Sequence, residues 1–310
     1  MSIKNLSKSA LWFIQATGYF GIYFIKFVFR GSLRKPVKTL RRERDMCILA
    51  NGPSTAIEIE RLKKYGVERD LMVVNFFASS DDFLWLQPAY YVLSDAAFFM
   101  HDQALGYEKI ERLYAGLNEK VTWRMILFVP YVSRKTMDWA KLFTNENLQV
   151  IYFNDIPYSG VFASRRIRNF LYDNGWAMPR IGTVVQPCIY LSILMGYKTI
   201  RLFGVEHDWL KTIAINDKNE VCLLDRHFYD GNEKAVYVPW ISPYAKEKVP
   251  YPLCTRLQGL ATLFESHMVL NDYARRMRCR IVNHTPDSYI DAYERDGVQT
   301  EARVEPSDFR

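Results

Sequence analysis

The stretch from Gly182 to Trp209 reads GTVVQPCIYLSILMGYKTIRLFGVEHDW and predicts a buried helix followed by a buried strand. Positions 184–195 are apolar almost all round, and Gly196 stands where a left-handed helix cap forms most easily. The run 199–203 is short, β-branched and apolar, which is typical of a central parallel strand covered on both faces. This pair of elements indicates an α/β fold.

The rest of the chain alternates between strand-like and helix-like segments. Six further strands are expected at 46–50, 71–76, 90–93, 124–129, 150–153 and 280–282. This alternation predicts a Rossmann-like, mostly parallel sheet with helices on both faces, forming one catalytic domain over 46–299. The segment 209–249 is polar, aromatic and proline-bearing without a steady period, so we expect a long loop or lid there. The tail 300–310 is expected to be loose.

Composition places the chain among globular proteins of a reducing compartment. The formal net charge of +7 includes a dense basic run, GSLRKPVKTLRRER at 31–44, which favours a local partner over nucleic acid. The five cysteines are an odd number without short paired spacing, so neither a disulfide framework nor a zinc site is predicted.

The N-terminal run 10–29, ALWFIQATGYFGIYFIKFVF, is close to the ~20 apolar residues that span a bilayer, although Gln15 and Lys26 interrupt it. It lacks the cleavage site of a removable signal peptide. With the basic run behind it, residues 1–45 predict either an interfacial helix or a single membrane anchor, with the body of the protein in the cytoplasm. A soluble amphipathic helix docked on the same or another subunit is the alternative.

Polar residues follow the first two expected strands. The first strand runs into NGPST, and a glycine turn before a helix offers backbone amides to an anion, so Asn51, Gly52 and Ser54 are candidate nucleotide-binding residues. An ordinary capped turn explains the same pattern. Asn75 closes the second strand and, together with Asn51, could read a base or a ribose.

Gly204, Glu206, His207 and Asp208 follow the strand at 199–203, where α/β sheets place their ligands. Consecutive residues do not normally all face one ion, so no metal constellation is predicted, and a divalent ion held by phosphates is the remaining option. Helix capping by the two carboxylates and packing of His207 beneath a loop are the alternatives.

Histidine supplies the candidate general base. His227, in DRHFYDG within the expected lid and close to Tyr229, is the first choice, and His207 competes with it. His101 and His267 lie in helical surroundings and are expected to be structural, whereas His284 follows a strand and could border the site.

With these motifs assembled, the chain resembles the bacterial sialyltransferases of glycosyltransferase family 42, which extend lipooligosaccharide, and a wider group similar to 6-hydroxymethylpterin diphosphokinase. The likeness covers roughly residues 46–294. It rests on the strand leading into NGPS (51–54), VVNFF (73–77), YYVLSD (90–95), GT (182–183), MGYKTIRLFGVE (195–206), HFYD (227–230) and RIVNHTPDSYIDAYE (280–294).

The resemblance implies roles for several residues. Asn51 and Asn75 would contact a cytidine nucleotide, and Thr183 would line the same site, although Val184 stands where the family has a serine. His227 would be the catalytic base by order. The family's phosphate-stabilising tyrosines are replaced here by the stretch 206–209, and Tyr229 is the candidate substitute.

The sequence therefore predicts an inverting, sialyltransferase-like glycosyltransferase at the cytoplasmic face of the inner membrane. It would use a nucleotide-sugar donor, with a CMP-sugar as the candidate, and a glycan or lipid-linked glycan acceptor in cell-surface polysaccharide synthesis. No metal cofactor is expected, and a homo-oligomer is an open option. Glu206 or Asp208 would orient a histidine or bind sugar hydroxyls. The alternatives are a diphosphokinase-like enzyme with magnesium and ATP at these two carboxylates, and a non-catalytic membrane-associated assembly protein.

Overall fold

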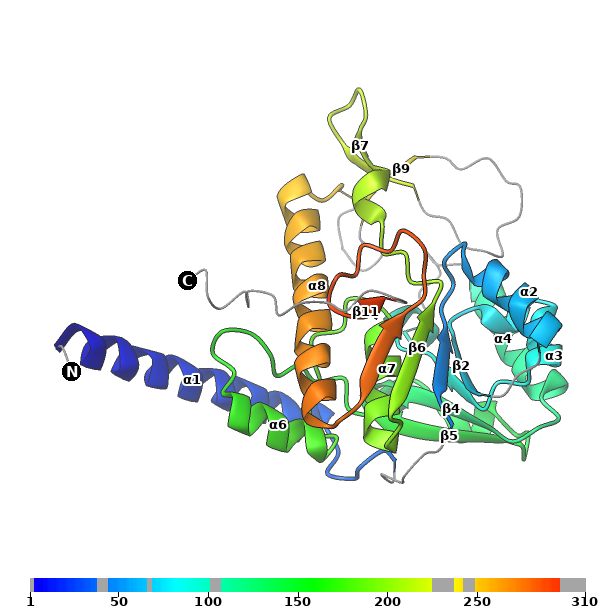
Figure 1. Cartoon of the computed structure of the whole chain (residues 1–310), viewed down its shortest axis with the longest axis horizontal. Coiled ribbons are helices and arrows are strands. Elements are labelled where there is room, and N and C mark those ends of the chain that lie inside the picture. The colour runs from blue at the N-terminus through cyan, green and yellow to red at the C-terminus, as the bar shows by residue number, and fades with distance from the viewer. Residues whose placement is uncertain are drawn as a thin grey trace.

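An eight-stranded parallel sheet forms the centre of the molecule (Figure 1). The computed structural model describes residues 3–37, 44–65, 69–100, 107–224, 237–241 and 249–295. The strands lie in the order β11-β10-β6-β1-β2-β3-β4-β5, and every neighbouring pair is parallel. Their bounds are β1 Met46–Leu49, β2 Asp70–Val74, β3 Tyr90–Val92, β4 Met125–Pro130, β5 Leu148–Phe153, β6 Thr199–Phe203, β10 Arg280–Asn283 and β11 Glu294–Arg295.

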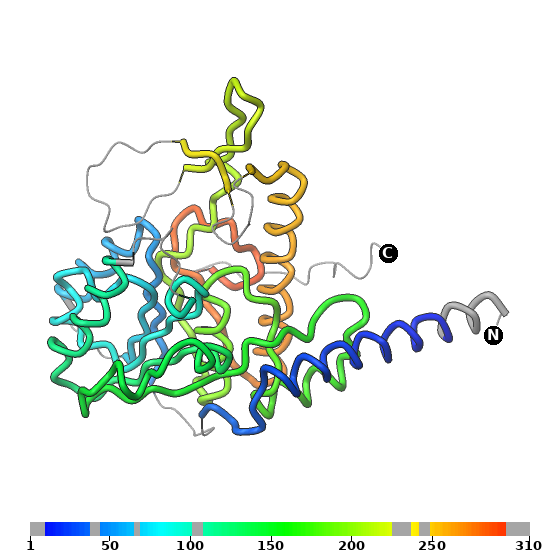
Figure 2. The backbone as a smooth tube through the Cα atoms, turned by 180° about the vertical axis from the view of Figure 1, so that it is seen from behind, coloured from blue at the N-terminus to red at the C-terminus, as the bar shows by residue number. Residues whose placement is uncertain are grey.

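Helices cover both faces of this sheet, which confirms the predicted fold class. One face packs against α7 and α8, and the opposite face packs against α2, α3 and α4 (Figures 1 and 2). The α-helices are α1 Ile3–Arg30, α2 Thr55–Tyr65, α3 Asp82–Leu86, α4 Tyr107–Lys120, α5 Trp139–Leu142, α6 Arg165–Asp173, α7 Val185–Met195 and α8 Leu253–Arg276. Short 3-10 helices lie at Phe77–Ser79, Ala96–Phe98, Tyr131–Lys135 and Trp209–Thr212.

Strand alternation divides the core between the two faces. In β1, Met46 and Ile48 point toward α7 and α8, whereas Cys47 and Leu49 point toward the α2 and α4 side, and all four are fully buried. A strand covered on both faces needs apolar residues at most positions, which is why β1 reads as a continuous apolar run. β6 departs from this at Arg201, which is half-buried and paired with Asp45 at 2.8 Å. Helix α7 is buried at all eleven positions and ends at Gly196 with φ of 92°, as predicted.

The segment expected to be a loop or lid at 209–249 contains regular structure. Strands β7 Ile213–Ile215, β8 Val221–Leu223 and β9 Val238–Pro239 form a second, antiparallel sheet that projects beyond the carboxyl ends of the main sheet (Figure 1). The Asn216 side chain accepts hydrogen bonds from the amides of Lys218 and Glu220 and thereby closes the hairpin. The prediction missed this hairpin because its strands are only two or three residues long.

Candidate functional site

The candidate site lies where β1 separates the two halves of the sheet. From β1 the chain builds β2 to β5 on one side, and it then returns to place β6 and β10 on the other. Parallel sheets bind ligands beyond the carboxyl ends of the strands at such a topological switch point. The residues that follow β1, β2 and β6 here are Asn51, Asn75 and Glu206.

Glu206 reaches across from β6 to the start of α2. Its Oε1 accepts a hydrogen bond from the Ser54 amide at 2.7 Å, while the Gly52 amide donates to the Gly204 carbonyl at 3.0 Å. A carboxylate is favourable at a helix N-terminus because the helix dipole and free amides are positive there. The amides predicted to bind a phosphate are therefore occupied in part by the protein's own carboxylate.

Two glycines allow this close approach. A Cβ on Gly52 would lie 1.6 Å from Glu206 Oε2 and 2.5 Å from the Gly204 carbonyl oxygen. A Cβ on Gly204, which has φ of 67°, would lie 1.8 Å from Thr55 Oγ1. Thr55 Oγ1 itself donates to the Ala50 carbonyl at 2.6 Å. Gly52 and Gly204 therefore shape the site, whether or not they touch a ligand.

Four buried polar atoms at this edge have no hydrogen-bond partner among the residues that the structure describes. They are Asn51 Oδ1, Ser54 Oγ, Asn75 Oδ1 and Glu206 Oε2. Buried polar groups are normally paired, because an unpaired one keeps its desolvation cost. Asn75 also has φ of 49°, a left-handed conformation that asparagine adopts more readily than most residues. Three of these atoms can only accept, so the edge suits a ligand rich in hydroxyl or amino donors.

His207, His267 and Tyr293 form a row of buried rings beside this edge, in edge-to-face contact. His207 Nε2 lies 3.4 Å from Thr183 Oγ1, and the His207 ring centroid lies 5.2 Å from that of His267. His267 Nδ1 in turn lies 2.8 Å from the Tyr293 hydroxyl, while its Nε2 is buried without a described partner. Burial lowers the pKa of His207 to about 3 and that of His267 well below its usual range, so both imidazoles are neutral near pH 7.

Trp209 packs against His207, and Arg256 lies against the Trp209 and Trp240 rings. The Trp209 ring centroid is 4.8 Å from that of His207, and the Arg256 guanidinium lies 5.8 Å from the Trp209 ring and 5.3 Å from the Trp240 ring. Arg256 comes from the first turns of α8, and Trp240 follows β9. Three segments that are distant in sequence thus meet at the same end of the sheet. Arg256 contributes the positive charge, and Trp209 and Trp240 contribute the aromatic rings.

The remaining predicted residues are distributed as follows. His227 and Tyr229 lie outside the described residues, as do His101 and the tail 300–310. Asp208 forms an ion pair with Lys211 at 4.0 Å. In the described part of the chain, no group of three or more His, Cys, Asp or Glu side chains could hold a metal ion. His284 stacks on Phe203 with ring centroids 4.9 Å apart, next to the site edge.

Sequence reasoning missed His267, Tyr293 and Arg256 as site residues. His267 was expected to be structural because it lies in a long helix, and its proximity to His207 comes only from the packing of α8 over α7. Arg256 precedes the apolar part of α8 and carries no motif. Tyr293 lies in the motif RIVNHTPDSYIDAYE (280–294), and membership of that motif was the one signal in the sequence that could have marked it as a site residue.

Comparison with protein-family models finds no match to this sequence, and comparison with curated proteins finds none either. Among solved structures, the chain is similar to the MAf glycosyltransferase from Magnetospirillum magneticum AMB-1, with a TM-score of 0.45 and 14% sequence identity. The similarity covers 88% of this chain and 37% of that protein, so this chain spans well under two thirds of the other's length. What indicates the function is therefore the arrangement of the site itself.

Proposed function

We propose that this protein is an inverting glycosyltransferase that binds a nucleotide-sugar at the carboxyl ends of β1, β2 and β6. The observation that carries the proposal is the set of four buried, unpartnered polar atoms among the described residues, on Asn51, Ser54, Asn75 and Glu206. The resemblance to sialyltransferases supports a CMP-sugar as the donor and a lipid-linked or cell-surface glycan as the acceptor.

The acceptor atoms at this edge match the nucleoside part of such a donor. Ribose hydroxyls and the amino group of cytosine are hydrogen-bond donors, and Asn51 Oδ1, Asn75 Oδ1 and Glu206 Oε2 can each accept one. An acidic residue that binds ribose hydroxyls is familiar from dinucleotide-binding sheets. Glu206 would then read the ribose rather than orient a histidine.

The phosphate would lie away from the start of α2. A second negative charge beside Glu206 would be repelled by its carboxylate, and the Ser54 amide already donates to that carboxylate. Arg256, held between Trp209 and Trp240, supplies the positive charge that a departing nucleotide phosphate needs. Tyr229 stays the second candidate for stabilising this leaving group.

The acceptor hydroxyl must lose a proton as the glycosidic bond to the nucleotide breaks. His227 is proposed as the general base by its order in the chain, with Thr183 and His207 lining the donor pocket. His207 is the competing base, although a pKa of about 3 makes its neutral imidazole a weak one near pH 7.

The first test is thermal unfolding of the purified full chain with CMP, CDP, UDP, GDP or ATP, each with and without magnesium. A ligand present at 100 times its dissociation constant stabilises the folded state by about 2.7 kcal/mol. We expect stabilisation by CMP without metal, and we expect Asn75→Ala to weaken it by roughly 2- to 10-fold in affinity for one lost hydrogen bond. Asn174→Ala is the matched control, since among the described residues its side chain donates to the Phe170 carbonyl in the last turns of α6 and not to the candidate site.

Turnover distinguishes the two candidate bases. Release of CMP from a CMP-sugar should fall by at least about 100-fold in His227→Ala if His227 is the base, and CMP affinity should stay unchanged. Loss of turnover only in His207→Ala would transfer the role to His207. Stabilisation by ATP with magnesium and by no other nucleotide would overturn the proposal in favour of pyrophosphate transfer.

A further inference from the structure

Helix α1 presents an apolar face to solvent. Residues 10–30 form a helical stretch long and apolar enough to cross a membrane, and only 11% of its apolar window is buried. The exposed apolar side chains lie along most of its length and are Leu11, Trp12, Phe13, Ile14, Ile22, Phe24, Ile25, Val28 and Phe29. A contiguous exposed surface of this kind marks an interaction site.

The opposite face of α1 is docked on the body of the protein. Tyr19 donates from its hydroxyl to the Ser159 carbonyl at 2.7 Å, and Tyr23 donates to the Trp176 carbonyl at 3.1 Å. Tyr23 is 4% exposed and belongs to the main core cluster. The C-terminal half of α1 is therefore part of the folded domain, while its N-terminal half extends beyond it (Figure 1).

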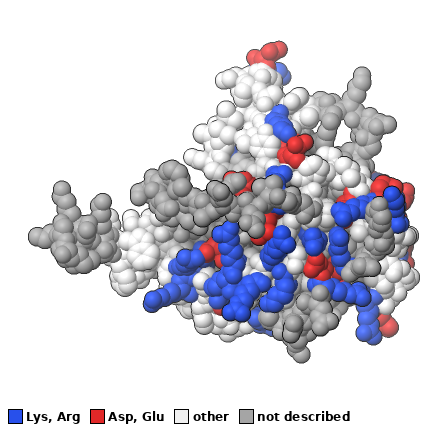
Figure 3. Space-filling view, viewed as in Figure 1, with Lys and Arg blue, Asp and Glu red and all other residues white. Residues whose placement is uncertain are grey.

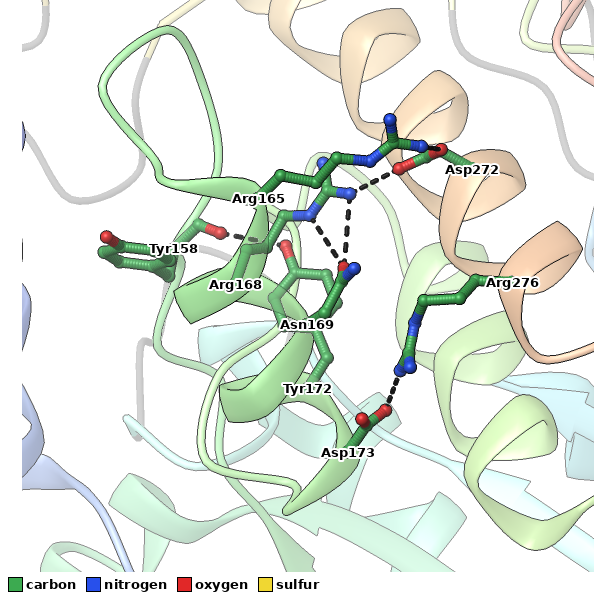
Figure 4. Close-up of polar contacts among 8 residues, drawn as sticks. All are labelled: Tyr158, Arg165, Arg168, Asn169, Tyr172, Asp173, Asp272 and Arg276. Atoms are coloured by element: carbon green, nitrogen blue, oxygen red, sulfur yellow. Dashed lines mark hydrogen bonds and ion pairs between the residues drawn. The ribbon is translucent and has the colours of Figure 1, made fainter.

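Helix α6 and the segment before it, on which α1 is docked, are fixed to α8 by ion pairs. Figure 4 shows Arg165 and Arg168 of α6 paired with Asp272 of α8, and Arg276 of α8 paired with Asp173 of α6. The Tyr172 hydroxyl also donates to the Tyr158 carbonyl at 3.0 Å. These contacts hold α6 and the segment before it in one place relative to α8.

A bilayer-spanning orientation conflicts with this docking. Spanning needs ~20 residues of α1 within a hydrocarbon layer ~30 Å thick. The helix is docked from Trp12 onward, on residues 158–161 and on Trp176. These partners flank α6, so α6 with Arg165, Arg166 and Asp173 would be carried into that layer as well. Charged side chains facing lipid are strongly disfavoured there. A helix lying in the interface plane meets no such conflict.

A basic surface lies next to α1. Figure 3 shows Lys and Arg gathered over α6 and the adjoining end of α8. Six arginines lie on α6 and at the end of α8, whereas the ion pairs between these helices contain two aspartates, Asp173 and Asp272. The arginines are Arg165, Arg166, Arg168, Arg275, Arg276 and Arg278. Excess positive charge beside an exposed apolar helix matches an anionic lipid surface. The Phe27, Trp176 and Phe170 rings continue from α1 to α6, and Phe170 is itself exposed.

We propose that the protein binds an anionic membrane with α1 lying flat in the bilayer interface, its outward apolar face among the acyl chains and the arginines around α6 against the headgroups. This orientation excludes the spanning alternative. It does not rest on the proposed function, because none of the residues that carry it lies in the candidate site.

Depth measurement tests this orientation directly. Leu11, Ile22 and Phe29 are spaced by 11 and 7 residues and therefore lie on one stripe of the helix. Each is replaced in turn by cysteine in a Cys254→Ser background, since Cys254 is the exposed native thiol among the described residues. The cysteine is labelled with an environment-sensitive fluorophore on vesicles of phosphatidylcholine with 30% phosphatidylglycerol, and quenched by lipids brominated at two depths.

A flat helix predicts the same shallow depth at all three positions. A deep label at position 22 with shallow labels at 11 and 29 would overturn the proposal in favour of a spanning helix. Absence of vesicle binding together with a dimer in solution would overturn it in favour of a second copy covering this face.

Binding variants give a second, independent readout. Ile25→Glu should reduce vesicle binding by at least about tenfold, because it places a charge in the acyl region. Ile57→Glu, on the exposed face of α2, is the matched control and should leave binding unchanged. Arg166→Glu should reduce binding to anionic vesicles and its dependence on salt, and equal binding of wild type to neutral vesicles would contradict the proposed role of the arginines.

Discussion

Replacing Glu206 by Gln separates its structural role from its role in ligand binding. The carbonyl oxygen of the new amide side chain can still accept the Ser54 amide hydrogen bond that Glu206 Oε1 accepts at 2.7 Å. Its NH2 group must then take the place of Oε2, which is buried without a described partner. Donors on the ligand would consequently meet a donor instead of an acceptor.

The expected loss of affinity follows from the charge on the lost acceptor. A hydrogen bond to a charged group contributes about 1.5–3 kcal/mol, and each 1.4 kcal/mol is a factor of ten. Glu206→Gln should therefore weaken nucleotide binding by about 10- to 150-fold. The ligand-free protein should lose no more than about 1 kcal/mol of its unfolding free energy, because the hydrogen bond to Ser54 stays and only the attraction between the charge and the helix N-terminus is lost.

The assay is calorimetric titration of nucleotide into both proteins, with melting temperatures measured without ligand. Glu60→Gln is the matched control, because Glu60 lies on the exposed surface of α2 and pairs with Lys63. Unchanged affinity in Glu206→Gln would refute the assignment of this edge to the ribose. A large fall in ligand-free stability would instead show that Glu206 acts through the fold.

Three further predictions concern stability. Gly52→Ala should destabilise the fold by about 1–3 kcal/mol in denaturant titrations, because the new Cβ meets the Gly204 carbonyl oxygen at 2.5 Å; an unchanged midpoint would contradict the packing described. His207 is neutral when folded, with a pKa of about 3, whereas the unfolded chain binds a proton near pH 6.5, so its contribution is complete above that pH and is lost as the pH falls toward 3. As the pH falls from 6.5 toward 3, the unfolding free energy of His207→Gln should decrease less steeply than that of the wild type. The difference in slope should be up to about 1.4 kcal/mol per pH unit, and parallel curves for the two proteins would refute this linkage. Asp272→Ala should cost about 1–2 kcal/mol because Arg168 is only 12% exposed, whereas Arg165→Ala, at a position 72% exposed, should cost less than about 1 kcal/mol; equal losses in urea unfolding would contradict this ranking.

Much of the fold was predictable from local pattern. Every strand of the main sheet except the two-residue β11 was expected within a few residues, because strands covered on both faces are mostly apolar along their length. The hairpin β7–β8 was missed since its strands are too short to show a period. The direction of α1 relative to the body was also beyond sequence reasoning, because aromatic residues occupy both its docked and its exposed face.

The candidate site was predictable in part for a related reason. Asn51, Asn75 and Glu206 each follow a strand, and parallel strands bring their carboxyl ends to one edge. The backbone amides at 52–55 were expected to be free for a phosphate. In the structure, the Glu206 carboxylate accepts a hydrogen bond from one of them, the Ser54 amide. His267 and Arg256 join the site through α8, which is far from β6 in the chain.

The sequence by itself determined the layered α/β architecture, the edge at which polar residues gather and the apolar character of α1, because each of these follows from the periodicity and order of residues. Only the tertiary structure decided which atoms at that edge are left without described partners, which histidines meet, and which face of α1 is covered. Those properties depend on contacts between segments separated by about half the chain, 152 positions for Ser54 and Glu206 and 153 for Tyr23 and Trp176, and local sequence carries no record of them.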